Sequence, residues 1–321
     1  MKKYLITGAM GFAAYYFLDY LNSLQEKCDV LCIYLDTPVN MDLYDFPYLQ
    51  MRFAKIDLLN YAAIEHELVS FFPTHIVHLA SFSSVAKSWH DPAVSFKNNT
   101  NIFINLAEII RTNNIPCKML SVGSSEEYGN VPVECIPIKE SMPLQPINPY
   151  AVARVAQEMM ALCYASSYKL NIVLTRSFNH IGPRQRDIFV IPSFVKQVLA
   201  NMKSNKSSEI KLLTGDISLI RDFIDVRDVV KAYYSLLEKG VSGEIYNICS
   251  GKGHSIKSII DMLSDLLEVK ISTAIDEKKI RPNDNKIIIG DNSKIVMQTG
   301  WEPKIQITDS LRDVIDYWKQ R

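Results

Sequence analysis

Short apolar runs alternate with longer amphipathic stretches as far as residue 177 of the chain. We predict buried strands from the apolar runs at 4–7, 29–35, 53–56, 74–80, 117–120 and 171–175. We predict helices, from apolar residues that recur at helical spacing, at 15–24, 61–72, 92–113 and 150–168. Strands that alternate with helices form βαβ units, so the pattern predicts an α/β fold with a doubly wound parallel sheet.

The pattern becomes less regular after Arg176. Residues 177–186 are polar and include a Gly-Pro pair, which predicts a loop. Later segments suggest a surface loop at 204–209, a strand leading into a helix at 221–229, a strand at 243–250, and helices at 191–202 and 308–319. With 321 residues, of which 48% are hydrophobic, the chain is long enough for two lobes.

Charge and cysteine content exclude several functions. Lys+Arg and Asp+Glu each number 35, so no net field attracts nucleic acid or an anionic membrane. No apolar run approaches a membrane span, and the first apolar stretch is too short for a signal peptide. The histidines show no metal-ligand pattern, so we expect no metal. The cysteines lack CxxC spacing, which predicts buried, reduced thiols in a cytoplasmic protein at Cys28, Cys32, Cys117, Cys135, Cys163 and Cys249.

A glycine-containing turn follows the first predicted strand. Gly8, Gly11 and Ala14 form a G-x-x-G-x-x-A pattern at the start of a helix. Gly8 permits a tight turn, and Gly11 lets a pyrophosphate approach backbone N–H groups at the helix N-terminus. Ala14 is small enough for helix and strand to pack closely. The pattern favours a dinucleotide-binding site.

Two aspartates at the ends of later strands fit the same site. Asp36 follows the second predicted strand, where a carboxylate binds the adenosine ribose hydroxyl and disfavours a 2′-phosphate. No arginine follows closely, so NAD is favoured over NADP, although Asp36 also suits a turn before Pro38. Asp57 follows the third predicted strand and is placed to face an adenine.

Two segments, 121–129 and 148–154, carry groups suited to proton transfer. The first follows the strand at 117–120, and open α/β sheets bind ligands at the carboxyl ends of their strands. The second opens a helix, with Tyr150 in the first turn and Arg154 one turn later on the same face. A hydroxyl, a carboxylate, a phenol and a fixed cation at one sheet edge predict acid–base chemistry.

A series of short motifs covers nearly the whole chain: TGAMGF, HLAS, SSEEYG, NPYAVAR, RSFNHIGPRQ, RDFIDVRDVV, YNICSG, RPND and TGWEPK. Their order and spacing resemble the extended short-chain dehydrogenases/reductases, in the branch of nucleotide-sugar epimerases, dehydratases and reductases. SSEEYG followed by FNHIGP is most similar to bacterial GDP-4-keto-6-deoxy-D-mannose reductases. The resemblance implies a Rossmann-type NAD(P)-binding domain, expected at 1–177 with about 222–249. It also implies a smaller mixed α/β domain for the nucleotide sugar, expected at 178–221 and 250–321.

The resemblance also implies hydride exchange between a nicotinamide and carbon 4 of a hexose linked to a nucleoside diphosphate. A proton must then move at the oxygen on that carbon. Tyr150 matches the family's acid/base tyrosine, and Ser124 matches the hydroxyl that hydrogen-bonds the substrate oxygen. Arg154 stands where the family has the lysine that binds the nicotinamide ribose and favours tyrosinate. Arginine is bulkier and planar, so the exchange is not conservative at a tight site. Because arginine keeps the positive charge that favours tyrosinate, we hypothesise that Arg154 replaces the lysine functionally.

Glu126 leaves reduction and dehydration both open. Dehydratases of this branch carry Thr-Asp-Glu or Thr-Ser-Glu where the chain has Ser124-Ser125-Glu126, and their carboxylate removes the proton at carbon 5. Related reductases carry the same glutamate. The chain lacks the Gly-Gln-Asp-Gly loop typical of GDP-mannose dehydratases, which favours a reductase. A structural Glu126, hydrogen-bonded near the sheet end, is the remaining alternative.

The resemblance and the predicted strand ends together give the full set of expected contacts. We expect NAD(H) or NADP(H) to contact Gly8, Met10, Gly11, Phe12, Asp36, Asp57, Leu58, Leu79, Ala80, Ser81, Asn99, Tyr150 and Arg154. We expect the nucleotide sugar to contact Ser84, Val85, Ser125, Glu126, Asn179, Val190, Lys196, Arg221 and Arg281. The two arginines match family positions that clamp phosphates and ribose, whereas surface ion pairs with Asp222 or Asp284 are the structural alternative.

The resemblance therefore favours an NAD(P)H-dependent reductase of a nucleoside-diphosphate 4-keto-6-deoxy sugar, GDP-4-keto-6-deoxy-mannose or a heptose analogue. A 4,6-dehydratase or a 4-epimerase that retains its NAD is the alternative enzyme. A non-catalytic dinucleotide-binding protein is the alternative of another class, because of Arg154. Relatives pair helices like 92–113 and 150–168 into a four-helix interface, so we expect a homodimer, with no nucleic-acid or membrane partner.

Overall fold

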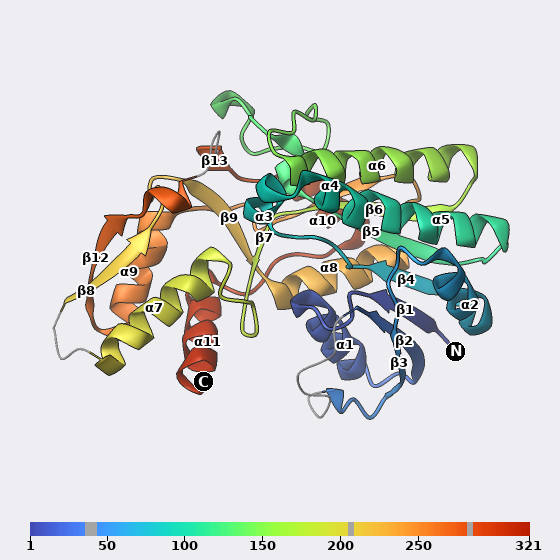
Figure 1. The fold of residues 1–321 in the computed structure, drawn as a ribbon, viewed down its shortest axis with the longest axis horizontal. Coiled ribbons are helices and arrows are strands. Elements are labelled where there is room, and N and C mark those ends of the chain that lie inside the picture. The colour runs from blue at the N-terminus through green and yellow to red at the C-terminus, as the bar shows by residue number, and fades with distance from the viewer. Residues whose placement is uncertain (36–43, 205–208, 281–284) are drawn as a thin grey trace.

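The structure is a computed structural model that describes residues 1–35, 44–204, 209–280 and 285–321. Its centre is a seven-stranded sheet in the order β10-β6-β5-β4-β1-β2-β3 (Figure 1). All neighbouring strands are parallel, which confirms the predicted parallel sheet. The strands are β1 (Lys3–Thr7), β2 (Cys28–Tyr34), β3 (Leu49–Lys55), β4 (His75–His78), β5 (Lys118–Ser124), β6 (Asn171–Ser177) and β10 (Ile245–Ile248).

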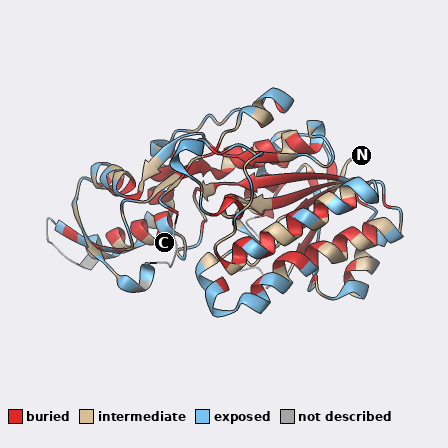
Figure 2. Cartoon of the chain, turned by 90° about the horizontal axis from the view of Figure 1, so that it is seen from above, coloured by how far each residue is buried: buried red, intermediate tan, exposed pale blue. Residues whose placement is uncertain are grey.

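Helices cover both faces of this sheet, because successive side chains of a strand point to opposite sides. Tyr4 and Ile6 of β1 pack in one core with α1 and α8, whereas Leu5 packs in the other with α2, α5 and α6. Seen from above, the buried strands lie beside helices whose outer faces are exposed (Figure 2). The covering helices are α1 (Phe12–Ser23), α2 (Tyr61–Phe71), α3 (Val85–His90), α4 (Pro92–Phe96), α5 (Ile102–Thr112), α6 (Pro149–Ser167), α8 (Val226–Lys239) and α10 (Ser293–Thr299).

The helix predicted at 92–113 is interrupted. A π-helical turn at Lys97–Asn101 separates α4 from α5. Asparagine side chains compete for backbone groups inside a helix, and the Asn99 amide donates to Ser95 O at 2.8 Å. The apolar spacing is therefore right for the stripe that faces the core, but the asparagine-rich centre leaves regular α-helical geometry.

A second region lies beside the central sheet. Its main strand, β9, pairs in parallel with β7 and β13 and antiparallel with β11. A parallel pair of strands, β8 and β12, shares a further core with α7, α9 and α11 (Figure 1). The bounds are β7 (Asn179–Ile181), β8 (Glu209–Thr214), β9 (Ile220–Asp225), β11 (Gly253–Ser255), β12 (Lys270–Ile275), β13 (Ile287–Ile288), α7 (Val190–Ser204), α9 (Ile256–Leu267) and α11 (Ile307–Lys319). Short 3₁₀ turns occur at Ser125–Tyr128, Val133–Cys135 and Glu277–Lys279.

Two sequence predictions for this part of the chain were inaccurate. The loop predicted at 177–186 contains β7, a strand whose polar sequence shows no apolar run and which forms because β9 offers it a partner. The strand predicted at 243–250 is shorter, since only Ile245–Ile248 pair with β6. In both places the neighbouring strand, more than local composition, sets the bounds.

The cysteine prediction holds for most of the thiols. All six are free, and Cys28, Cys32, Cys117 and Cys249 are buried. Cys135 and Cys163 are exposed, because one lies in a short 3₁₀ turn and the other on the outer face of α6. Within the described ranges, no helix has the length and apolarity needed to cross a membrane.

Candidate active site

The carboxyl ends of β1, β4 and β5 meet at one edge of the central sheet. From β1 the chain adds β2 and β3 on one side, and it then returns to add β4, β5 and β6 on the other. Open α/β sheets bind ligands at such a switch point. The loop after Thr7, the loop after His78 and the strand end at Ser124 all lie at this edge.

The loop after β1 fits a dinucleotide pyrophosphate. Gly8 has φ +68°, and a Cβ there would lie 2.8 Å from Ala80 N, so the turn needs glycine. Helix α1 begins directly after Gly11, and no side chain caps its first N–H groups. Those groups are therefore suited to a phosphate. The adjacent side chains of Met10 and Phe12 are partly exposed.

Polar contacts hold the loop after β4. Ala80 N donates to Thr7 Oγ1 at 3.1 Å, and the same hydroxyl contacts His78 Nδ1 at 2.9 Å. The Asn99 side chain is fully buried and accepts a hydrogen bond from Phe82 N at 3.1 Å. Asn99 therefore holds the loop after β4 from the buried side, through the bond to Phe82 N. The loop residues that we predict at the cofactor are partly exposed: Leu79, Ala80 and Ser81.

The other predicted cofactor residues differ in their surroundings. Asp57 is exposed, and its Oδ1 accepts a hydrogen bond from Leu59 N at 2.9 Å. Leu58 is buried in the core beneath α2 and α5. Asp36 lies outside the described residues, as does Arg281 of the predicted sugar site.

Tyr150 and Arg154 meet at the start of α6. Asn148 caps this helix, its Oδ1 accepting from Ala151 N at 2.8 Å, and Pro149 occupies the first turn. Arg154 Nε donates to the Tyr150 hydroxyl oxygen at 3.2 Å, and both side chains are buried. The structure therefore brings the phenol and the cation together, as their helical spacing predicts.

Arg154 also ties α6 to the strand that carries Ser124. Its Nη1 donates to Val122 O on β5 at 3.0 Å. Ser124 is the last residue of that strand, and its Oγ accepts a hydrogen bond from Glu126 N at 3.2 Å. Arg154 is therefore bound to β5 at Val122, two residues before Ser124, whose hydroxyl we predict to bind the substrate.

Glu126 links the two predicted segments directly. Its Oε2 accepts a hydrogen bond from Asn148 Nδ2 at 2.9 Å. Glu126 is half-buried, whereas the neighbouring Ser125 is buried. The carboxylate therefore binds Asn148, the cap residue of α6 that precedes Tyr150 by two positions, and supports the start of the helix.

Glu127 has a structural role that our sequence reasoning missed. It is fully buried, and its Oε1 accepts a hydrogen bond from Ser124 N at 2.6 Å. Burial, followed by the nearby Glu158, raises the pKa of Glu127 well above its usual range. The spacing Ser124-x-x-Glu127 is that of a capping box, and it was the available signal in the sequence.

Helix α3 brings two predicted sugar-site residues to the same cluster. Ser84 caps α3, its Oγ accepting from Lys87 N at 3.3 Å, and Val85 is the first helical residue. From this helix Ser88 Oγ accepts a hydrogen bond from Tyr150 N at 3.2 Å. Sequence periodicity did not predict α3, so this contact could be found only from the structure.

The remaining predicted sugar-site residues lie on the second region. Asn179 is partly buried on β7, and Val190 begins α7 with an exposed side chain. Lys196 of α7 is exposed and forms an ion pair with Asp187 at 2.5 Å. Arg221 lies on β9, where its Nη1 donates to its neighbour's carbonyl.

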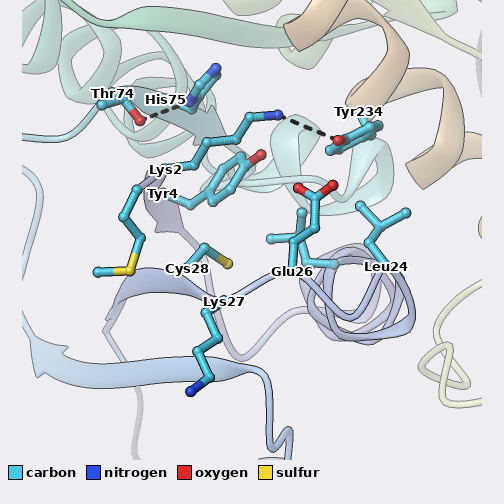
Figure 3. A pocket seen from close by; sticks show the side chains of 11 residues that line it. Lys2, Tyr4, Leu24, Glu26, Lys27, Cys28, Thr74, His75 and Tyr234 are labelled. Atoms are coloured by element: carbon cyan, nitrogen blue, oxygen red, sulfur yellow. Dashed lines mark hydrogen bonds between the residues drawn. The ribbon is translucent and has the colours of Figure 1, made fainter.

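A cavity of about 450 Å³ lies away from this edge. Residues at the amino ends of β1, β2 and β4 line it, among them Tyr4, Cys28 and His75 (Figure 3). Lys2 Nζ donates to Tyr234 OH at 3.4 Å across it. Because the candidate residues lie at the carboxyl ends of the strands, this cavity is not part of the candidate active site.

Sequence comparison decides the family. The family described as GDP-mannose 4,6 dehydratase matches residues 5–314. The chain belongs to the GDP-mannose 4,6-dehydratase family. GDP-6-deoxy-D-mannose reductase of Pseudomonas aeruginosa is 34% identical over 249 residues, 78% of this chain and 81% of the reductase. Human dTDP-D-glucose 4,6-dehydratase is 28% identical over 346 residues, 99% of this chain and 90% of that protein.

Solved structures place the fold within the same set of proteins. RMD from Pseudomonas aeruginosa, complexed with NADPH, has a TM-score of 0.85 at 29% identity, covering 100% of this chain and 99% of that one. UDP-glucose 4-epimerase from Thermus thermophilus, in complex with NAD, has a TM-score of 0.84 at 27% identity, covering 99% of each chain. Membership of the GDP-mannose 4,6-dehydratase family and these neighbours confirm the resemblance and the Rossmann-like fold.

Proposed function

We propose that this chain is an NAD(P)H-dependent reductase of the C4 keto group of a nucleoside-diphosphate 4-keto-6-deoxy sugar, with GDP-4-keto-6-deoxy-mannose as the leading substrate. The family membership supports an NAD(P)-dependent oxidoreductase of sugar nucleotides. Similar solved structures are complexed with NADPH or NAD, which supports NAD(P)(H) as the cofactor. The 34% identity to GDP-6-deoxy-D-mannose reductase supports reduction and a GDP-linked sugar.

One observation carries the proposal. Arg154 Nε lies 3.2 Å from the Tyr150 hydroxyl oxygen, in a buried setting at the carboxyl edge of the sheet. A buried guanidinium there stabilises the phenolate that remains after Tyr150 has given up its proton. This contact supports catalysis in spite of the missing lysine, and it disfavours a purely dinucleotide-binding role.

In the proposed reduction, Tyr150, Ser124 and Arg154 each have a separate role. When bound, a reduced nicotinamide supplies the hydride to carbon 4. Tyr150 gives its phenolic proton to the oxygen on that carbon as negative charge develops there. Ser124 Oγ, at the end of β5, donates a hydrogen bond to the same oxygen. Arg154 holds the phenolate, and its bond to Val122 O keeps α6 in place against β5.

The test is an assay of GDP-4-keto-6-deoxy-mannose with NADH and NADPH, comparing the natural chain with Tyr150→Phe. We expect stoichiometric cofactor oxidation by the natural chain and a loss of about 10²-fold or more in kcat for the variant. Dinucleotide binding, followed by fluorescence, should persist in Tyr150→Phe. Undiminished turnover by this variant, or tight binding of NADPH with no turnover of any 4-keto sugar nucleotide, would contradict the proposal.

A 4,6-dehydratase is the second candidate, because the half-buried Glu126 carboxylate lies beside the helix that carries Tyr150. A dehydratase would form a 4-keto sugar from GDP-mannose with no net cofactor consumption. Glu126→Gln separates the two: it abolishes dehydration, which needs a base at carbon 5, but leaves reduction largely intact. A retained-NAD 4-epimerase would instead interconvert sugars without a keto product.

Three further properties belong to the same proposal. NAD is favoured over NADP by Asp36, which lies outside the described residues, and the ratio of kcat/KM for the two cofactors decides this. We propose a cytoplasmic homodimer built on α4, α5 and α6. We also propose that Asn179, Lys196, Arg221 and Arg281 bind the diphosphate and ribose of the substrate.

A further inference from the structure

Gln157 makes the shortest of the three hydrogen bonds between Arg154 and Tyr150, Val122 O and Gln157. It lies on α6, three residues after Arg154, and is buried. Arg154 Nη1 donates to Gln157 Oε1 at 2.7 Å. In turn, Gln157 Nε2 donates to Ser121 Oγ on β5 at 2.9 Å and contacts Val122 O at 3.4 Å. Both polar atoms of the glutamine side chain are therefore occupied.

This arrangement satisfies a requirement that lysine would not have. A guanidinium is planar and directs its N–H groups along set directions, so burying it requires acceptors in that plane. Gln157 Oε1 and Val122 O both accept from Nη1, which orients Nε toward the Tyr150 hydroxyl. A rotation about the last bonds of Arg154 would break these contacts.

The charge of the partners matters as much as their position. Both acceptors of Arg154 Nη1 are neutral, so neither of them offsets the positive charge beside Tyr150. The next residue, Glu158, is a carboxylate, but it forms a two-bond ion pair with Arg176 on β6 at 2.8 and 2.7 Å. The one negative side chain next to Gln157 in the sequence is thus committed to another arginine.

Other titratable groups face the pair from the neighbouring elements. His78 on β4 is buried, and desolvation followed by the Arg154 charge lowers its pKa to about 3. Tyr233 on α8 is buried, and its hydroxyl forms a hydrogen bond with Ser177 Oγ at 2.8 Å. Desolvation raises the pKa of Tyr233. Both are uncharged near neutral pH. Glu126 lies at the end of β5 and is bound to Asn148.

We propose that Gln157 is a positioning residue that holds the Arg154 guanidinium against the Tyr150 phenol through a neutral contact and so lets arginine serve in place of lysine. The inference rests on the proposed function in taking Tyr150 as the proton donor. Hydrogen bonds connect Arg154 to Gln157 and Gln157 to Ser121. In this proposal, an arginine at position 154 requires the buried Gln157 amide.

The decisive variant is Gln157→Glu, which keeps the size and the acceptor but adds a negative charge 2.7 Å from Arg154 Nη1. We expect kcat to fall about tenfold or more with little change in KM, because the new carboxylate offsets the Arg154 charge that stabilises the phenolate. The alkaline limb of the pH profile for reduction should move to higher pH, since Tyr150 then keeps its proton longer. Gln298→Glu adds the same charge on the exposed face of α10 and should change neither.

Gln157→Met tests the positioning contact without adding charge. We expect a smaller loss of kcat in the natural chain and almost none when Arg154 is first changed to lysine, because an ammonium lacks the second nitrogen that Gln157 holds. Equal effects of Gln157→Met in the two backgrounds would overturn the proposal. So would a Gln157→Glu chain with unchanged kcat and pH profile.

A readout that needs no turnover separates this inference from the proposed function. An ultraviolet difference titration between the natural chain and the Tyr150→Phe variant reports ionisation of this phenol alone. Gln157→Glu should move that ionisation to higher pH even if the keto substrate proves wrong. An unmoved titration overturns the positioning role, whereas a moved titration without reduction of any 4-keto sugar nucleotide refutes only the proposed function.

Discussion

At the scale of single residues, the site depends on how buried polar groups find partners. Arg154 makes hydrogen bonds to a phenol, a backbone carbonyl and an amide. Glu127 accepts from Ser124 N and is held in a setting that favours its protonated form. Because a buried polar group without a partner destabilises the fold, changes at these residues affect stability as well as chemistry.

Arg154→Lys tests whether the arginine is a full replacement. We expect a lower kcat and a loss of about 1–3 kcal/mol in unfolding free energy, because Gln157 Oε1 and Val122 O lose their donor. Steady-state kinetics and urea unfolding measure both. A large rise in turnover would show instead that arginine is a poor substitute for the family's lysine.

His78 predicts a pH dependence of stability. Burial lowers its pKa to about 3 in the folded chain, against about 6.5 for an unperturbed histidine. The unfolded chain therefore binds a proton below pH 6.5 that the folded chain does not, so stability is full above that pH and falls as the pH drops. From pH 7 to 5 this residue should account for a loss of about 2 kcal/mol.

Urea unfolding of His78→Asn at pH 7 and pH 5 checks this linkage. The variant should lose less stability between the two pH values than the natural chain does, whatever its stability at pH 7. His66→Asn is the matched control, because the His66 side chain is exposed on α2. An equal pH dependence in the natural chain and in His78→Asn would refute the assignment.

At the scale of elements, the N-terminus of α6 organises the site. Asn148 caps the helix, binds Glu126 at the end of β5, and precedes Tyr150 by two residues. The ion pair between Glu158 and Arg176 fixes the same helix to β6. Helix α6 is held at its cap and along its buried face, and it thereby fixes the positions of Tyr150 and Arg154.

Asn148→Ala should therefore act on activity and stability together. Loss of the cap costs about 1 kcal/mol, and loss of the bond to Glu126 frees the first turn that carries Tyr150. Asn60→Ala removes an equivalent cap from α2, where Asn60 Oδ1 accepts from Ala63 N at 3.2 Å. Thermal unfolding should show similar losses for both, whereas kcat should fall only for Asn148→Ala. An equal kcat in both variants would contradict the role of the cap.

At the scale of the whole molecule, the residues of the proposed site come from both regions: α6 beside the central sheet carries Tyr150, whereas α7 and β9 of the second region carry Lys196 and Arg221 (Figure 1). Parallel strands direct their carboxyl ends to one side, so residues far apart in the sequence, such as Gly8 and Ser124, meet there. The outer surface of α3, α4 and α6 carries exposed apolar side chains, among them Trp89, Phe96, Val152 and Met159. This is the surface that the proposed homodimer would bury.

Changing Phe96 and Val152 together to glutamate tests the dimer. Buried charge across a symmetric helical interface is costly, so we expect the double variant to be a monomer with an intact fold. Sedimentation velocity measures the mass. Val69→Glu, on an equally exposed apolar position of α2, should leave the mass unchanged. A monomeric natural chain, or a double variant of unchanged mass, would refute the interface.

The sequence by itself determined those features that depend on local periodicity. Alternating apolar runs and amphipathic stretches specified the parallel sheet and its helices, since strands and helices have fixed repeats. The glycine turn after β1 was readable because only glycine adopts its backbone conformation without strain. The four-residue spacing of Tyr150 and Arg154 placed both on one helical face.

Only the tertiary structure decided how these groups are surrounded. The contact of Arg154 with Val122 O on β5, the burial of Glu127 and the pairing of strand β7 all depend on elements that are distant along the chain. Burial and charge compensation come from whatever packs against a side chain, and no local repeat encodes that. The sequence thus identifies Tyr150 and Arg154 as the candidate groups, and the packing of α6 against β5 sets their burial and their hydrogen-bond partners.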